Sequence, residues 1–136
     1  MNTIAVPLVE IRTSGSISDL DQTLTEALVE RFVDRTRLTL EPSEDAADAV
    51  LTTSVDRYSL TPVAVTGEER ASLNRVTIVV SVRYLDRVEE NERLSRTFTA
   101  SADYDPVEGP AGESEAVLRA VDQLANDIFT AATSDW

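Results

Sequence analysis

The stretch LNRVTIVVSVRYL (73–85) decides the fold, because it is the clearest structural element in the chain. Its apolar residues recur at every second position, a period typical of a β-strand that buries one face. The opposite face is mixed. The apolar face consists of Val76, Ile78, Val80, Val82 and Tyr84. We therefore expect a long strand in a sheet that is covered on one side.

Two further strands are expected on either side of this stretch. After a charged hairpin loop at 86–92, residues 94–104 carry small and aromatic residues on one face and Ser or Thr on the other. Before it, residues 49–60 predict a strand whose alternation is imperfect, and a bulge near Asp56 would reconcile its two halves. We expect residues 61–69 to form a loop.

The rest of the chain predicts two helices and one more strand. Residues 3–12 alternate like a strand, and Pro7 favours a position at a sheet edge because proline cannot donate to a ladder. Residues 20–35 and 113–133 each carry one apolar stripe at helical spacing, which is typical of a helix with one buried side. Residues 37–40 form a short extended piece.

These elements follow one another in the order β-α-β-β-β-α, with a breaker loop at 105–112 before the last helix. A sheet with one apolar face and two helices with one apolar stripe each predict an α+β two-layer sandwich. We expect a four-stranded mixed sheet with both helices on one face. The length of 136 residues fits a single domain over 1–136.

The composition excludes several classes of function. The formal net charge is −13, whereas a nucleic-acid binder needs a basic surface. There is no Cys and no His, which excludes disulfides, thiolate or histidine metal sites and the usual general base within these residues. All 12 basic residues are Arg, which indicates either a GC-rich, salt-adapted genome or selection for bidentate contacts, and the scattered positions favour the first.

The sequence shows no membrane-spanning segment and no signal peptide. No apolar run approaches the ~20 residues that a spanning helix needs. The chain starts MNTIAVP, without a basic region or a long apolar stretch. A mature domain of a longer precursor and a short cytosolic protein would both look like this, so composition alone leaves the two open.

An ordered set of segments over most of the chain resembles the LptE-like family of outer-membrane lipopolysaccharide-assembly lipoproteins. The segments are TIAVPLVEIRT (3–13), LDQTLTEALVERF (20–32), DAVLTTSVDRYSLTPVA (48–64), NRVTIVVSVRYLD (74–86), RTFTASADY (96–104) and AVDQLANDIFTAATSDW (120–136). The resemblance implies an exported, non-enzymatic protein without cofactors, held at the periplasmic side of the outer membrane by a lipidated cysteine. It also implies a role as a plug inside a β-barrel that inserts lipopolysaccharide. The anchor would lie upstream of Met1.

Two groups of residues are candidates for contact with that partner or with lipopolysaccharide. Arginines suit phosphate oxygens, but pairing with neighbouring acids (Asp86, Glu89, Glu90, Glu92) is the simpler interpretation. Hydroxyls suit a polar barrel lumen and an ordinary solvated sheet face equally well. The arginines are Arg75, Arg83, Arg87, Arg93 and Arg96, and the hydroxyls are Thr77, Ser81, Ser95, Thr97, Thr99 and Ser101.

Other conspicuous residues favour structural roles. The pairs Glu68-Glu69 and Glu89-Glu90 fall in expected loops, where nothing makes them converge on a substrate or metal. Tyr58 and Trp136 are large aromatics that we expect to pack on their own domain rather than in a partner.

Two alternatives to the barrel plug remain open from the residues. One is a periplasmic α/β lipoprotein that binds a ligand or peptide on its sheet and is unrelated to lipopolysaccharide. The other is a cytosolic enzyme of carboxylate chemistry from a salt-adapted organism. The absence of His and Cys makes the enzyme the least favoured of the three.

Overall fold

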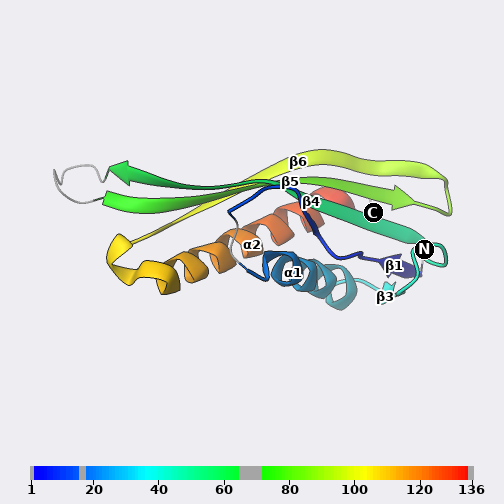
Figure 1. Cartoon of the computed structure of the whole chain (residues 1–136). Helices are drawn as coiled ribbons and strands as arrows, with labels where there is room; N and C mark the ends of the chain where they lie inside the picture. The colour runs from blue at the N-terminus through cyan, green and yellow to red at the C-terminus, as the bar shows by residue number, and fades with distance from the viewer. Residues whose placement is uncertain (1, 16–17, 65–71, 135–136) are drawn as a thin grey trace.

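Three long antiparallel strands form the body of the molecule. The computed structural model describes residues 2–15, 18–64 and 72–134. Strands β4 (Ala49–Ala64), β5 (Ser72–Asp86) and β6 (Asn91–Tyr104) run back and forth as a meander, as Figure 1 shows. The expected strand at 73–85 is confirmed as β5. Its neighbours include the expected ranges but extend further, so the turn between β5 and β6 covers 87–90 rather than the predicted 86–92.

The expected bulge is present in β4. Val55 pairs with Val80 and Arg57 pairs with Val79, so Asp56 is the extra residue. Because one residue is inserted, Leu51 before the bulge and Tyr58 after it face the same side of the sheet. Both side chains are buried against the helices.

The prediction of a loop from residue 61 was wrong, because β4 continues through Pro62 to Ala64. Pro62 stands opposite Asn74 in the ladder with β5. Among the described residues, the partners on the other side of β4 reach no further than Val55. At Pro62 the strand therefore has one free edge, where a residue without an N–H group is tolerated.

The N-terminal part of the sheet differs from the expected single strand over 3–12. The chain forms two short strands, β1 (Thr3–Ala5) and β2 (Glu10–Ile11), separated around Pro7. Both pair with β4 in parallel, and β1 also pairs in parallel with β3 (Thr39–Leu40). The described sheet is mixed as expected but has six strands rather than four, in the order β3-β1-β4-β5-β6 with β2 beside β4.

Both helices cover the same face of the sheet, as expected (Figure 1). Helix α1 (Leu20–Asp34) ends within a residue of the predicted boundary. Helix α2 (Gly109–Thr133) begins four residues earlier than predicted, after a short 3-10 turn, η1 (Pro106–Glu108). The loop expected over 105–112 is therefore shorter. Pro110 lies in the first turn of α2, where a residue has no intrahelical N–H bond to lose, so the helix can begin before it.

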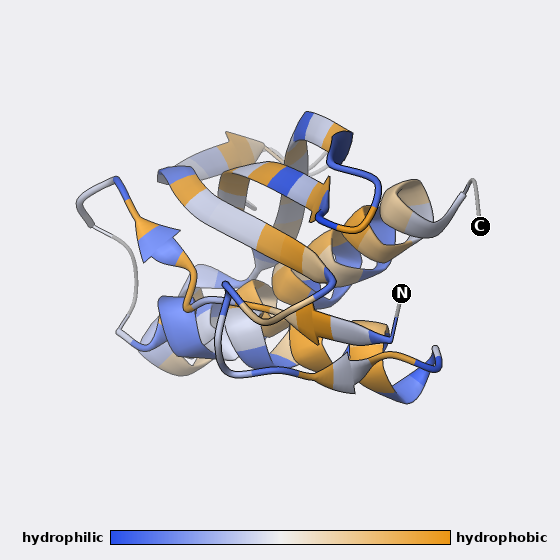
Figure 2. Ribbon diagram, turned by 90° about the vertical axis from the view of Figure 1, so that its right-hand side faces the viewer, coloured by the Kyte–Doolittle hydropathy of each residue, from blue (hydrophilic) through white to orange (hydrophobic). Residues whose placement is uncertain are grey.

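The core fills the space between the helices and the sheet. Figure 2 shows hydrophobic and hydrophilic residues alternating along the strands, as a sheet with one covered face requires. Phe32 of α1 lies at the centre, with its ring centroid 5.8 Å from that of Tyr84 in β5 and 5.2 Å from that of Phe129 in α2. Among the described helices, none is both long and apolar enough to cross a membrane.

Candidate functional site

The face of β4, β5 and β6 that points away from the helices is not covered by either of them, and we call it the open face (Figure 1). Its centre is lined by hydroxyl side chains, which explains why it can remain in contact with water. In β5 and β6 the pairs Thr77–Ser101, Val79–Thr99 and Ser81–Thr97 stand opposite one another. Five of the six predicted hydroxyl candidates, Thr77, Ser81, Thr97, Thr99 and Ser101, are thus brought together, and Ser95 stands opposite Arg83 on the same face.

Hydrogen bonds connect these hydroxyls across the strands. The hydroxyl oxygens of Thr77 and Ser101 lie 3.0 Å apart. At the bulge, Ser54 Oγ donates to Asp56 Oδ1 at 2.9 Å, and Ser81 donates to the other carboxylate oxygen. The extra carboxylate of β4 therefore joins two strands on the open face.

Two of the predicted arginines lie at opposite ends of the open face, each paired with a carboxylate of β6. Arg75 Nε donates to Asp103 Oδ1 at 2.8 Å, and its Nη2 donates to Oδ2 at 3.1 Å. This bidentate contact holds the pKa of Asp103 below its ordinary value. Arg83 Nη2 lies 2.7 Å from Glu92 Oε2. Both guanidinium groups are neutralised within the chain.

The other three predicted arginines do not join them. A second bulge makes Arg93 the extra residue of β6, and its guanidinium binds the buried carboxylate of Asp86. Arg96 lies 5.0 Å from the centroid of the Phe98 ring and pairs across the strands with Val82, which faces the helices. Arg87 is in the turn after β5. The five arginines therefore do not form one patch.

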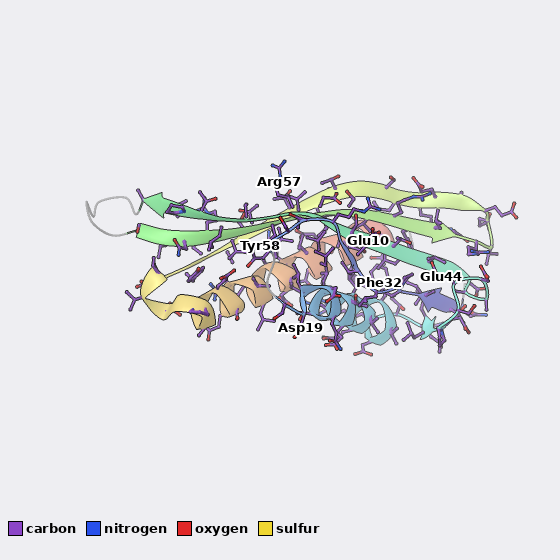
Figure 3. All side chains as sticks on the ribbon, viewed as in Figure 1. Glu10, Asp19, Phe32, Glu44, Arg57 and Tyr58 are labelled. Atoms are coloured by element: carbon purple, nitrogen blue, oxygen red, sulfur yellow. The ribbon has the colours of Figure 1, made fainter. Side chains whose placement is uncertain are left out.

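Arg57 is the arginine that the sequence analysis missed. It stands opposite Val79 in the centre of the open face and projects away from the helices, whereas its neighbour Tyr58 points toward them (Figure 3). It forms no hydrogen bond or ion pair with any residue that the structure describes. The signal was the predicted bulge at Asp56, since a bulge places two successive side chains on one face.

The remaining candidates have structural positions. Tyr58 packs on its own domain, as expected, and its hydroxyl donates to Glu113 of α2. Burial first, and then this contact with a carboxylate, raise the pKa of Tyr58. Glu89 and Glu90 are exposed at the turn between β5 and β6. Glu68, Glu69 and Trp136 lie outside the described residues.

The arrangement is a broad polar surface on one side of an α+β domain. Within the described residues, no group of three or more acidic side chains is placed to hold a metal ion. The model of the LptE family, described as lipopolysaccharide-assembly, matches residues 1–132. The chain therefore belongs to the LptE family of lipopolysaccharide-assembly proteins.

Solved structures share the fold at low sequence identity. A hypothetical protein from Chlamydia trachomatis is 14% identical, with a TM-score of 0.66, over 98% of this chain and 99% of that one. A minor lipoprotein from Acinetobacter baumannii is 18% identical, with a TM-score of 0.55, over 98% and 94% of the two chains. The PelC dodecamer from Paraburkholderia phytofirmans is 13% identical, with a TM-score of 0.57, over 90% and 85%. No curated protein matches the sequence.

Proposed function

We propose that this protein is a non-enzymatic outer-membrane lipoprotein that serves as plug and scaffold for the β-barrel that inserts lipopolysaccharide. Membership of the lipopolysaccharide-assembly family and the open face support this role. In the proposal the protein lies on the periplasmic side and reaches the membrane only through a lipid anchor. Since these residues include no Cys, the proposal places the anchoring cysteine upstream of Met1.

The charge of the open face is the observation that carries the proposal. On β4, β5 and β6 this face holds three arginines and three carboxylates, so its formal charges cancel, whereas the whole chain carries −13. The lumen of a membrane barrel is polar. A hydroxyl-rich face without net charge can contact such a wall with less electrostatic repulsion than the rest of the surface. The six residues are Arg57, Arg75, Arg83, Asp56, Asp103 and Glu92.

Photocrosslinking from the open face tests the barrel contact. A benzophenone amino acid at Ser101, on the open face, is compared with one at Glu30, which is exposed on α1. We expect the first to crosslink one large β-barrel in outer membranes of the source organism, and the second to crosslink little or none. Equal crosslinking from both positions, or recovery of no barrel with folded protein, would overturn the proposal.

Direct contact with lipopolysaccharide is the second part of the proposal, and it assigns that contact to Arg57. The guanidinium groups of Arg75 and Arg83 are already engaged by carboxylates, whereas that of Arg57 is exposed and suits a phosphate oxygen. We expect Arg57→Gln to weaken binding of purified lipopolysaccharide and Arg83→Gln to leave it nearly unchanged. An equal loss in both variants would refute the assignment.

A further inference from the structure

The outer edge of β6 is a second surface, which adjoins the open face along Thr97 and Thr99. In the described part of the sheet, β6 pairs with β5 alone, so the backbone groups on its other edge have no ladder partner. At the end of the strand Arg119 Nη2 donates to the carbonyl of Asp103 at 2.6 Å and covers that position. Unpaired strand edges are templates for the addition of another strand.

The middle of this edge lacks proline and bulges, two of the features that usually prevent strand addition, and its one charged side chain is that of Arg96. The segment LSRTFTASA (94–102) contains no proline and no glycine. The bulge of β6 is at Arg93, outside the segment, so the ladder with β5 is regular from Leu94 to Tyr104. Natural edges are commonly protected by proline, bulges or lysine.

A groove follows the same part of the edge, between β6 and the C-terminal part of α2. Its volume is about 510 Å³. One wall offers the Phe98 ring with Arg96 over it, and the other offers the carboxylate of Asp127. The groove is lined by Arg96, Thr97, Phe98, Thr99, Asp127, Thr130, Ala131 and Ser134. It therefore combines a free backbone edge with an aromatic ring that Arg96 already covers and a carboxylate on the opposite wall.

We propose that this groove binds an extended segment of a partner protein as an added strand beside β6, and that the segment carries a basic residue. The negative end of the α2 dipole and Asp127 favour a cation there. A second copy of this chain is disfavoured as the occupant, because two chains of charge −13 repel each other. The proposal does not rest on the proposed function, although Thr97 and Thr99 border both the groove and the open face.

A peptide of known sequence serves as the probe. It has eight residues, alternating valine and threonine with arginine at both ends, and it is acetylated and amidated. The control peptide is identical except that alternate backbone amides are N-methylated, which removes donors to the strand edge. We expect the first peptide to shift the amide NMR signals of residues 96–99 and 127–134. We expect it to bind about tenfold or more tightly than the control, because the N-methylated control loses several backbone hydrogen bonds to the strand edge.

Two matched variants test the charge preference. Asp127→Asn removes the carboxylate of the groove, and Glu115→Gln removes an exposed carboxylate about three turns away on the same helix. We expect Asp127→Asn to weaken peptide binding by up to about fivefold and Glu115→Gln to have no effect. Neither variant should change crosslinking from Ser101, which lies on the open face and not in the groove, so failure here is distinguishable from failure of the proposed function.

Three results would overturn the inference. The first is equal binding of the N-methylated peptide, which would mean adsorption without backbone pairing. The second is a shift pattern away from β6, or no binding at millimolar peptide. The third is a concentration-dependent dimer in sedimentation whose NMR changes map to residues 94–102, which would make a second copy the occupant.

Discussion

Removal of the Asp86 carboxylate should destabilise the protein far more than removal of any surface ion-pair partner. Asp86 Oδ1 accepts the backbone N–H groups of Val88 and Glu89, each at 3.0 Å, and Oδ2 accepts Arg93 Nε at 2.8 Å. Its side chain is 1% exposed. Asp86 thus holds the turn between β5 and β6 and neutralises the arginine of the second bulge.

The expected magnitude follows from these contacts. Breaking a buried ion pair by removing one partner costs about 3–5 kcal/mol. Arg93 is 31% exposed, so water recovers part of this loss, and we expect Asp86→Ala to lower the free energy of unfolding by about 3 kcal/mol. Asp86→Asn keeps an acceptor for the two amides but loses the charge, and we expect about 2 kcal/mol.

Urea unfolding followed by circular dichroism measures these losses, and Glu92→Ala is the matched control. Glu92 pairs with Arg83 from the same hairpin, but the two side chains are 37% and 59% exposed. Pairs of this kind contribute at most about 1 kcal/mol. A loss in Asp86→Ala no larger than that in Glu92→Ala would refute the reasoning.

The pH dependence supplies an independent check. Burial raises the pKa of Asp86, but hydrogen bonds from the Glu89 amide and Arg93 outweigh it and hold the pKa below the ordinary value of 3.8. The carboxylate therefore contributes stability above pH 3.8, and this contribution is lost as the pH falls through the lower pKa of the folded state. The difference between wild type and Asp86→Asn should shrink accordingly in acid.

Three other predictions concern residues buried between the helices or between the helices and the sheet. Gly112→Ala should lower the free energy of unfolding by about 1 kcal/mol despite alanine's helix propensity, because its Cβ would stand 2.7 Å from Tyr104 Cδ2; thermal unfolding would show a lower Tm. Tyr58 and Tyr84 should stay protonated at pH 11 in the folded protein, since burial raises both pKa values, that of Tyr84 to about 12. Replacing either residue by Phe should therefore not reduce the absorbance at 295 nm measured at pH 11. Because the unfolded chain releases these protons near pH 10, the free energy of unfolding should fall as the pH rises above 10. Arg31→Ala should cost about 2 kcal/mol in urea unfolding, because this buried side chain joins α1 to an amide and a carboxylate of α2.

The elements that local patterns predict are those whose burial has a clear period. The alternation of β5 and the stripe of α1 place their residues correctly because one face of each is in the core. The bulge at Asp56 was also predictable, since the apolar positions of β4 change parity there. Residues 3–12 and 37–40 were expected to be extended, and β1, β2 and β3 lie within them. The division at Pro7 and the parallel pairing with distant segments leave no local pattern, so they were not predictable.

The candidate site was predictable as a face but not as a set of partners. The hydroxyls of β5 and β6 lie together because cross-strand neighbours follow from the hairpin register. Arg93 left the face because the bulge there changes parity and turns this residue toward Asp86. Arg96 shares the helix-facing side with Phe98, and Arg87 lies in the turn. Acidic residues are numerous and spread along the chain, so the sequence alone does not say which carboxylate meets which guanidinium.

The two kinds of strand pairing divide the sheet into parts that should open at different rates. The antiparallel meander has long, continuous ladders, whereas β1 and β2 are each held to β4 over two residue pairs. Regions with few hydrogen bonds open locally with less free energy than the global transition. The N-terminal strands should therefore exchange their amide hydrogens first, and should be the last part of the sheet to dock during folding because they must find a strand more than 40 residues away.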